Sequence, residues 1–514
     1  MFDRAPGAAM WNNRAWSRAA RAPPSPEPSE MLDPAVHAQL AAILPPSALL
    51  TTAEETRPYE CDGLTVYREL PAAVAIPDNE AQVIEILKRC HAARVPVVAR
   101  GAGTSLSGGA MPDRNGVVLS LAKFKRILAV DPLARTAVVQ PGVRNLAITE
   151  AAAPYGLYYA PDPSSQIACT IGGNVAENAG GVHCLKYGLT VHNVQRVRGV
   201  LISGEVVEFG SDAPDSAGYD LLGLINGSEG LLAVITEITV KLLPKPQCAQ
   251  VALAAFDDIV QAGAAVSSVI TAGILPAGLE MMDQPATRAV EEFVHAGYPL
   301  DAKAVLLVET DGTPEEVATD MAEIRRVLTE AGATEVRISK DEAQRQLFWS
   351  GRKAAFPAIG RITPDYYCMD GTIPRKKLAQ VLARIEELSK QFGLRCANVF
   401  HAGDGNLHPL ILFDANVEGE VERTEAFGAA ILELCIEVGG TITGEHGVGV
   451  EKLPGMCAQF QPGELERFLG IKAVFDAHSL LNPGKGVPTL HRCAEFGKLH
   501  VHKGQIPHPE IPRF

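Results

Sequence analysis

The distribution of apolar and polar residues changes several times along the chain. Residues 1–30 are polar and rich in arginine and proline, whereas residues 31–69 show the periodicity of short helices. From residue 70 to residue 245, short runs rich in Val, Ile and Leu alternate with Gly-rich turns, a pattern that predicts strands. These runs are Val95–Arg100, Gly116–Leu121, Thr136–Pro141 and Ile235–Leu243.

Pro244-Lys245-Pro246 interrupts the last of these runs and predicts a linker. Beyond it, helices are expected over Ile259–Ala272, Pro314–Ala331, Arg375–Phe392 and, as the final helix, Glu418–Val438. Strands are expected over Ala304–Glu309, Glu335–Ser339 and Arg395–His401. The sequence therefore predicts an α+β protein with two domains, at residues 70–245 and 246–488. A disordered extension (1–30), an N-terminal helical segment (31–69) and a tail (489–514) complete the expected organisation.

Composition and charge exclude several classes of protein. The chain has 514 residues and a formal net charge of −14, so it lacks the basic surplus typical of nucleic-acid binders. No apolar run reaches the ~18 residues that a membrane-spanning helix requires. The ten cysteines are scattered, and no two are separated by only two or three residues, which excludes the usual iron–sulfur and zinc-ribbon patterns.

The same features favour a cytoplasmic location. Scattered thiols suit a reducing compartment, and the start of the chain has no apolar signal segment. Its four arginines, with Asp3 as the only acidic residue before Glu27, are also compatible with a transit peptide, but its prolines favour a disordered extension.

The densest glycine cluster, Arg100–Gly109, directly follows an expected strand. A strand that runs into a Gly-rich loop suits phosphate binding, because glycines let backbone N–H groups converge on an anion. The third glycine of a nicotinamide-binding fingerprint is replaced by Leu106, and the lysine of an ATP-binding loop by Gly109. Further clusters of Gly, Asn, Ser and Pro occur at residues 161–165, 171–181 and 226–231. Four such clusters favour a bulky ligand over isolated turns.

These four segments resemble the flavin-binding domain of the vanillyl-alcohol oxidase superfamily. The resemblance implies an FAD-binding domain of two subdomains. It also implies FAD contacts at Arg100, Gly101, Gly103, Thr104, Ser105, Gly108, Pro161, Ser164, Gly172, Gly173, Asn174, Asn178, Gly180, Gly181, Glu229, Gly230, Ile235 and Asn482. His183 and Cys184 lie nearby, but the flavin is expected to be held without a covalent link.

Two histidine-containing motifs in the second half indicate a metal site. His401 and His408 flank a Gly-Asp-Gly turn that could fold them toward one point, and Thr443–Gly449 adds Glu445 and His446. Two histidines and one glutamate form a usual ligand set for Zn, Mn or Fe with an open position.

The motifs HxGDGNxH and GEHGxG resemble those of FAD-linked oxidases that act on D-2-hydroxy acids, most of all the catalytic subunits of bacterial glycolate oxidases. The similarity covers residues 31–514 and is strongest at 57–64, 181–193, 365–374 and 490–497. It implies an FAD-linked oxidase C-terminal domain with a divalent metal, Zn or Mn, held by His401, His408 and Glu445. It also implies that His446 is the base and that Arg352 binds the substrate carboxylate.

The resemblance thus implies oxidation of a small 2-hydroxy acid, glycolate and also D-lactate, by hydride transfer to flavin N5. The hydroxyglutarate enzymes have lysine where this chain has Cys368, which favours a monocarboxylate. The implied partners are a second flavin-domain subunit and an iron–sulfur subunit at the inner face of the bacterial cytoplasmic membrane. Two alternatives remain: a D-lactate dehydrogenase that acts alone, and a noncatalytic electron-relay subunit, for which a metal and a base are unnecessary. The roles of Glu445 and His446 could also be exchanged.

Overall fold

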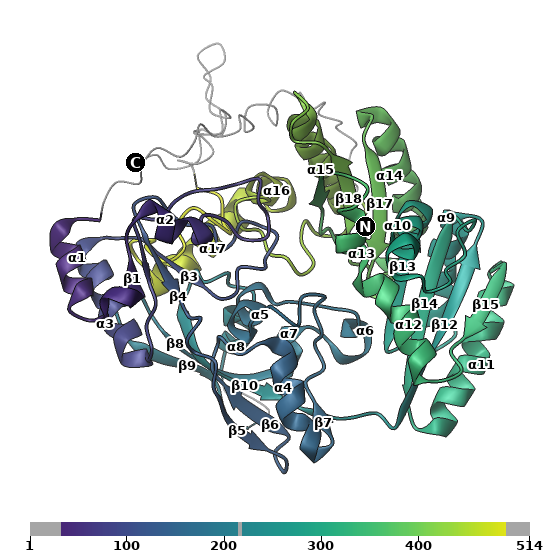
Figure 1. Cartoon of the computed structure of the whole chain (residues 1–514), viewed down its shortest axis with the longest axis horizontal. Helices are drawn as coiled ribbons and strands as arrows, with labels where there is room; N and C mark the ends of the chain where they lie inside the picture. Colours follow the sequence, from purple (N-terminus) through teal and green to yellow (C-terminus); the bar gives the residue numbers. More distant parts are fainter. Residues whose placement is uncertain (1–31, 214–217, 490–514) are drawn as a thin grey trace.

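The computed structural model describes residues 32–213 and 218–489, and the extension expected over 1–30 and the tail beyond residue 489 lie outside this range. Figure 1 shows two lobes side by side. The first lobe consists of residues 32–247 and 476–489, the second consists of residues 248–460, and residues 461–475 lead from the second lobe back to the first. No helix in the described ranges is long and apolar enough to cross a membrane.

The first lobe begins with a four-stranded sheet in the order β1 (Leu49–Leu50), β2 (Ala73–Ala75), β4 (Val117–Ser120), β3 (Val97–Arg100). Strands β2, β3 and β4 are parallel, because helix α3 (Glu80–Ala93) provides the crossover between β2 and β3. Helix α3 packs with α1 (Pro34–Ala41) over the sheet, and their apolar faces form one core. Two short segments, α2 (Ala53–Thr56) and a 3₁₀ turn (Arg57–Tyr59), lie between β1 and β2 in the chain.

The first lobe also contains a five-stranded antiparallel sheet with a separate core. Its order is β5 (Ile127–Asp131), β6 (Thr136–Val139), β10 (Val234–Lys241), β8 (Val194–Val200), β9 (Val206–Gly210). The helices that lie between β6 and β10 in the chain are α4 (Asn145–Ala152), α5 (Ile171–Glu177), α6 (Cys184–Tyr187), α7 (Thr190–Asn193) and α8 (Leu221–Ile225). The preceding strand, β10, ends before Pro244, as expected, but Pro244 does not lie in a linker. It belongs to a short strand, β11 (Leu243–Pro244), which pairs with β7 (Leu157–Tyr158).

The second lobe is a seven-stranded antiparallel sheet between two layers of helices. The order is β15 (Glu335–Ile338), β12 (Cys248–Phe256), β14 (Ala304–Gly312), β13 (Gly278–Asp283), β17 (Arg395–Phe400), β18 (Pro409–Phe413), β16 (Asp365–Cys368). One face packs on α9 (Ile259–Thr271), α11 (Pro314–Glu330), α14 (Leu378–Phe392) and α15 (Glu420–Glu437). The other packs on α10 (Gln284–Val294), α12 (Glu342–Lys353) and α13 (Ala355–Ile359).

Helices α9, α11 and α14 and strands β14, β15 and β17 confirm the elements expected there. The prediction that the final helix lies near Glu418–Val438 was wrong, because α16 (Leu453–Gln459) and α17 (Pro462–Phe475) follow it. Helix α17 brings the chain back to the first lobe, where Lys472 donates to the Leu231 carbonyl and Phe475 packs against Phe209 (Figure 1). Beyond it, the backbone N–H of Val97 donates to Leu480 O at 2.8 Å.

Candidate active site

A cavity of about 350 Å³ is lined by residues of both lobes. Twelve of the expected FAD contacts line it: Arg100, Gly101, Gly103, Thr104, Ser105, Ser164, Gly172, Gly173, Asn174, Glu229, Gly230 and Ile235. From the second lobe it is lined by Arg352, His408, Glu445 and His446. The cavity therefore brings together segments that lie up to hundreds of residues apart in the chain.

Seven residues expected at the site are not among those that line the cavity, namely Gly108, Pro161, Asn178, Gly180, Gly181, Asn482 and His401. Two of them instead hold the surrounding backbone. Asn482 Nδ2 donates to the carbonyl oxygens of Gly109, at 3.0 Å, and of Glu229, at 2.6 Å. The Asn178 carboxamide oxygen accepts from the backbone N–H of Val191 at 2.9 Å.

The loop after β3 is shaped by glycine and anchored by Arg100. Gly103 has a φ of +71°, a conformation that L side chains rarely adopt, and an added Cβ would collide with the Arg100 guanidinium. Arg100 Nη1 donates to the carbonyl oxygens of Cys61, at 2.8 Å, and Ala110, at 3.3 Å. The Arg100 side chain therefore fixes the loop. The backbone amide groups of the loop then form part of the cavity wall.

Several buried polar atoms at the cavity have no hydrogen-bond partner among the described residues. They are Thr170 Oγ1, Asn174 Nδ2, Glu177 Oε2, Arg352 Nη2 and His446 Nδ1, and all five residues line the cavity. Buried polar groups in folded proteins are normally paired, so this cluster indicates a polar ligand. A glycine-lined wall with free donors fits a flavin dinucleotide, and Arg352 fits a carboxylate.

The two histidines of the first motif converge because of strand pairing. His401 follows β17 and His408 precedes β18, so both lie at the same end of an antiparallel pair. Their Nε2 atoms lie 3.4 Å and 3.0 Å from the same Glu445 oxygen, Oε1. Their Nδ1 atoms face Glu280 Oε1 at 2.8 Å and the Met369 carbonyl at 3.2 Å.

This geometry fits a divalent metal. Each imidazole directs Nε2 to a common point, and a second partner holds its other nitrogen, as in protein metal sites. Burial favours the neutral acid of Glu445, but hydrogen bonds with His401 and His408 hold its pKa well below the usual range. The carboxylate is therefore available as a ligand.

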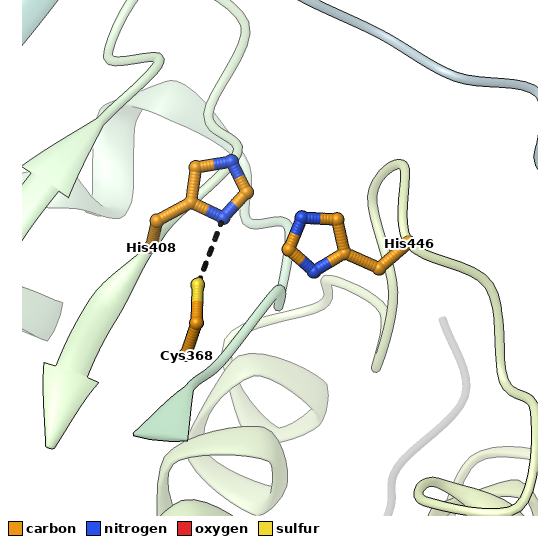
Figure 2. Close-up of side chains that lie close together, drawn as sticks. All are labelled: Cys368, His408 and His446. Carbon is orange, nitrogen blue, oxygen red and sulfur yellow. Dashed lines mark hydrogen bonds between the residues drawn. The ribbon is translucent and has the colours of Figure 1, made fainter. Parts of the chain in front are cut away.

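His446 stacks on His408, with ring centroids 5.0 Å apart and an interplanar angle of 14°. Figure 2 shows Cys368 next to His408, with its Sγ 3.9 Å from His408 Nδ1. Cys368, His408 and His446 form a second group whose donor atoms lie within 4.8 Å of one another. Burial lowers the pKa of His446 to about 4, so its imidazole is neutral at neutral pH.

Asp370, adjacent to the histidines in space, organises the loop that carries Glu445 and His446. Its carboxylate accepts from the backbone N–H groups of Gly444 at 3.0 Å and His446 at 2.9 Å, and from Thr443 Oγ1 at 2.6 Å. The buried Lys452 ammonium lies 3.4 Å away. Burial favours the protonated form, but the nearby cations hold the pKa of Asp370 below its usual range.

Arg352, in the last turn of α12, is 1% exposed and donates from Nε to Glu280 Oε2 at 2.7 Å. Glu280 therefore bridges Arg352 and His401. The sequence did not single out Glu280 or Glu177. A charged residue in the otherwise apolar run Leu279–Met282 was the only available signal for Glu280.

Comparisons with known proteins agree with this architecture. Residues 71–210 match the model of an FAD binding domain, and residues 245–486 match that of the C-terminal domain of FAD linked oxidases. The chain is 61% identical to glycolate oxidase subunit GlcD of Escherichia coli over 92% of this chain and 94% of that protein. It is 41% identical to the Bacillus subtilis protein of the same name, over 83% and 91%. A D-lactate dehydrogenase of Anaerostipes hadrus is 33% identical, over 86% and 94%.

Solved structures show the same fold at low identity. p-Cresol methylhydroxylase has a TM-score of 0.75 at 16% identity, covering 90% of this chain and 98% of that one. Alkyldihydroxyacetonephosphate synthase has a TM-score of 0.71 at 17% identity, covering 89% and 87%. These likenesses confirm the expected α+β fold, and the match to an FAD binding domain confirms that the chain is a flavoprotein.

Proposed function

Because the chain belongs to the family of FAD-linked oxidases, we propose that it oxidises a small 2-hydroxy acid, glycolate and also D-lactate, to the 2-oxo acid. The chain is an FAD-dependent oxidoreductase. The observation that carries the substrate class is the cavity. It combines a glycine-rich wall with Arg352, whose Nη2 lacks a partner, and with the unpartnered Nδ1 of the neutral His446.

In this proposal each side chain has one task. Arg352 holds the substrate carboxylate by charge-assisted hydrogen bonds. His446 accepts the proton of the α-hydroxyl group, which is too weak an acid to lose it unaided at neutral pH. FAD, held by the Gly-rich segments around residues 100–109 and 171–181, supplies the hydride acceptor.

We further propose that His401, His408 and Glu445 hold a divalent metal, Zn or Mn. Such an ion supplies Lewis-acid stabilisation of developing alkoxide charge. Support comes from the convergence of two Nε2 atoms and one carboxylate oxygen. His408→Ala should lose metal by elemental analysis while its FAD content stays unchanged. Metal-free wild-type protein with full turnover would contradict the proposal.

The substrate is tested by initial rates with glycolate, D-lactate, L-lactate and D-2-hydroxyglutarate and an artificial electron acceptor. Glycolate should have the highest kcat/KM and D-lactate a lower one. D-2-hydroxyglutarate should be poorest, because Cys368 offers no cation to a second carboxylate. A preference for D-lactate would favour the alternative of a D-lactate dehydrogenase that acts alone. No flavin reduction by any of the four would support an electron relay instead.

We also propose that the chain works as a subunit, because the two relatives with the highest identities quoted above are named as subunits. The cysteine spacing offers no cluster of its own for onward electron transfer. The proposed acceptors are a second flavin-domain subunit and an iron–sulfur subunit at the inner face of the cytoplasmic membrane. Purification from native membranes under mild conditions should recover all three chains together.

A further inference from the structure

A continuous chain of polar contacts joins the two lobes beside the cavity. At its centre is His183, directly before α6. Its Nδ1 lies 2.8 Å from Asp162 Oδ2, and its backbone N–H donates to Asp162 Oδ1 at 3.1 Å. Its Nε2 lies 3.1 Å from Glu309 Oε1 on β14, in the second lobe. Both ring nitrogens are therefore engaged, and His183 is not among the residues that line the cavity.

The contact continues from Glu309 into α12. Its second oxygen accepts from Arg345 Nη1 at 2.7 Å and from Trp349 Nε1. Arg345, Trp349 and Arg352 follow one another at intervals of four and three residues, so they lie on one face of the helix. Glu309 thus fixes the rotation of the helix that presents Arg352.

Lys186 and Tyr187, at the end of the helix α6 that follows His183, reinforce the contact. The Lys186 ammonium contacts the Asp311 carboxylate and donates to the Asp311 carbonyl at 2.9 Å. The Tyr187 hydroxyl donates to Asp311 Oδ2 at 2.7 Å. Asp311 is two residues beyond Glu309 on β14, so both carboxylates extend from the same face of the strand.

The two ends of this chain of contacts border the cavity. Asp162 directly precedes Pro163, Ser164 and Ser165, which line the cavity on the first lobe. At the other end, Arg352 shares Glu280 with His401. A shift between the lobes would therefore move the carboxylate-binding group relative to the cavity wall.

We propose that His183 is a positioning residue: by bridging Asp162 and Glu309 it fixes α12, and with it Arg352, against the first lobe. This inference rests on the proposed function of Arg352. Burial alone would favour the neutral imidazole, but the flanking carboxylates of Asp162 and Glu309 raise the pKa of His183 well above its usual value. A charged donor between two carboxylates makes stronger hydrogen bonds than a neutral one.

Two substitutions separate the contacts of the ring. In His183→Asn the amide reaches only the position of Nδ1, so the contact to Asp162 survives and the bridge to Glu309 is lost. In His183→Gln the amide reaches the position of Nε2 and keeps a neutral bridge to Glu309. His192→Gln is the matched control, because His192 is exposed and its ring bonds only within its own turn.

The experiment measures KM and kcat for glycolate, FAD content, and the affinity of the non-oxidised probe acetate from the change in the flavin spectrum. His183→Asn should raise KM and weaken acetate binding by about tenfold, since sub-ångström misplacement of binding groups is costly. Its kcat and FAD content should stay near wild type, and His183→Gln should be less affected. Arg345→Gln, which weakens the α12 side, should shift the same two quantities.

Unchanged KM and acetate affinity in His183→Asn would overturn the proposal. So would a parallel fall of FAD content, kcat and affinity in both His183→Asn and Arg345→Gln, which is the signature of general destabilisation. If no 2-hydroxy acid reduces the wild-type flavin, the proposed function fails. The acetate titration then still tests whether the bridge controls the carboxylate site.

Discussion

Glu445 and His446 are neighbours in the chain, yet their side chains have different surroundings. Glu445 Oε1 lies within 3.4 Å of two imidazole nitrogens, whereas His446 Nδ1 has no partner among the described residues. The turn at Gly447, whose φ is +81°, lets the chain reverse immediately after them. The geometry favours Glu445 as the ligand and His446 as the base.

His446→Asn should therefore keep metal and FAD but slow anaerobic reduction of the flavin by substrate. The expected loss is roughly 10²-fold or more, the usual effect of removing a general base. Stopped-flow absorbance measures the reduction, and elemental analysis measures the metal. Glu445→Gln is the matched variant and should lose metal. Metal-free His446→Asn beside metal-replete Glu445→Gln would exchange the two roles.

Arg352→Lys tests whether the planar guanidinium of Arg352 binds the substrate carboxylate through paired hydrogen bonds. Lysine keeps the charge but cannot make the paired hydrogen bonds that a planar guanidinium makes with a carboxylate. KM for glycolate should rise by roughly tenfold with FAD content unchanged, as expected from the loss of one charge-assisted hydrogen bond. The control is Arg361→Lys at an exposed position. Equal KM values in both variants would remove Arg352 from the substrate site.

At the scale of elements, local signals explain which parts of the fold the sequence predicts. Helix α11 was predicted to within one residue, because Thr313 and Glu316 form a capping box and Pro314 occupies the first turn. Helix α17 was missed for a physical reason. Lys472 is its only buried residue, so no apolar stripe marks it.

The residues of the site likewise divide into those that sequence motifs predict and those that only the folded structure brings together. The motifs around His401 and Glu445 predicted residues that do meet in space, because their glycines and histidines are close in sequence. Glu280 reaches His401 only through the pairing of β13 with β17, in which Met281 lies opposite Phe400. A single sequence contains no direct signal for such a pairing, so the contact of Glu280 with His401 could not be predicted.

The loop over residues 443–446 is held by the carboxylate of Asp370, which lies two residues beyond the end of β16. Asp370→Asn removes the charge that accepts from the backbone N–H groups of this loop, and it leaves the buried Lys452 ammonium with Glu451, also 3.4 Å away, as its carboxylate partner. We expect a loss of about 1.5–3 kcal/mol in the free energy of unfolding, the usual contribution of hydrogen bonds to a charged group. Metal content should also fall, because the loop carries Glu445. Urea titration and elemental analysis check both.

Asp365→Asn is the control for this prediction. Asp365 lies at the start of the same strand, where its carboxylate accepts from the Ala415 backbone N–H. If Asp370→Asn matches this control in stability and metal content, the loop is held by other contacts.

For the whole molecule, the decisive feature is the return of the chain to the first lobe through α17. Asn482 lies at this return and donates to carbonyl oxygens in two cavity segments, at Gly109 and Glu229. It is 2% exposed, so water cannot readily replace its amide. The first lobe is therefore completed by residues that come last among those the structure describes.

The resemblance to known flavoproteins implied that Asn482 contacts FAD directly, but Asn482 is not among the residues that line the cavity. Asn482→Ala should still weaken FAD binding, because Asn482 holds two segments of the cavity wall. Each buried carbonyl left without its donor costs about 1–3 kcal/mol, so a loss of roughly tenfold or more in FAD affinity is expected. Titration of the apoprotein with FAD, followed by flavin fluorescence, measures the affinity. Asn416→Ala, at an exposed site of the second lobe, is the control. Asn482→Asp keeps the shape but cannot donate, and it should lose affinity to the same extent. Wild-type affinity in Asn482→Asp would show that the return of the chain does not hold the two cavity segments in place.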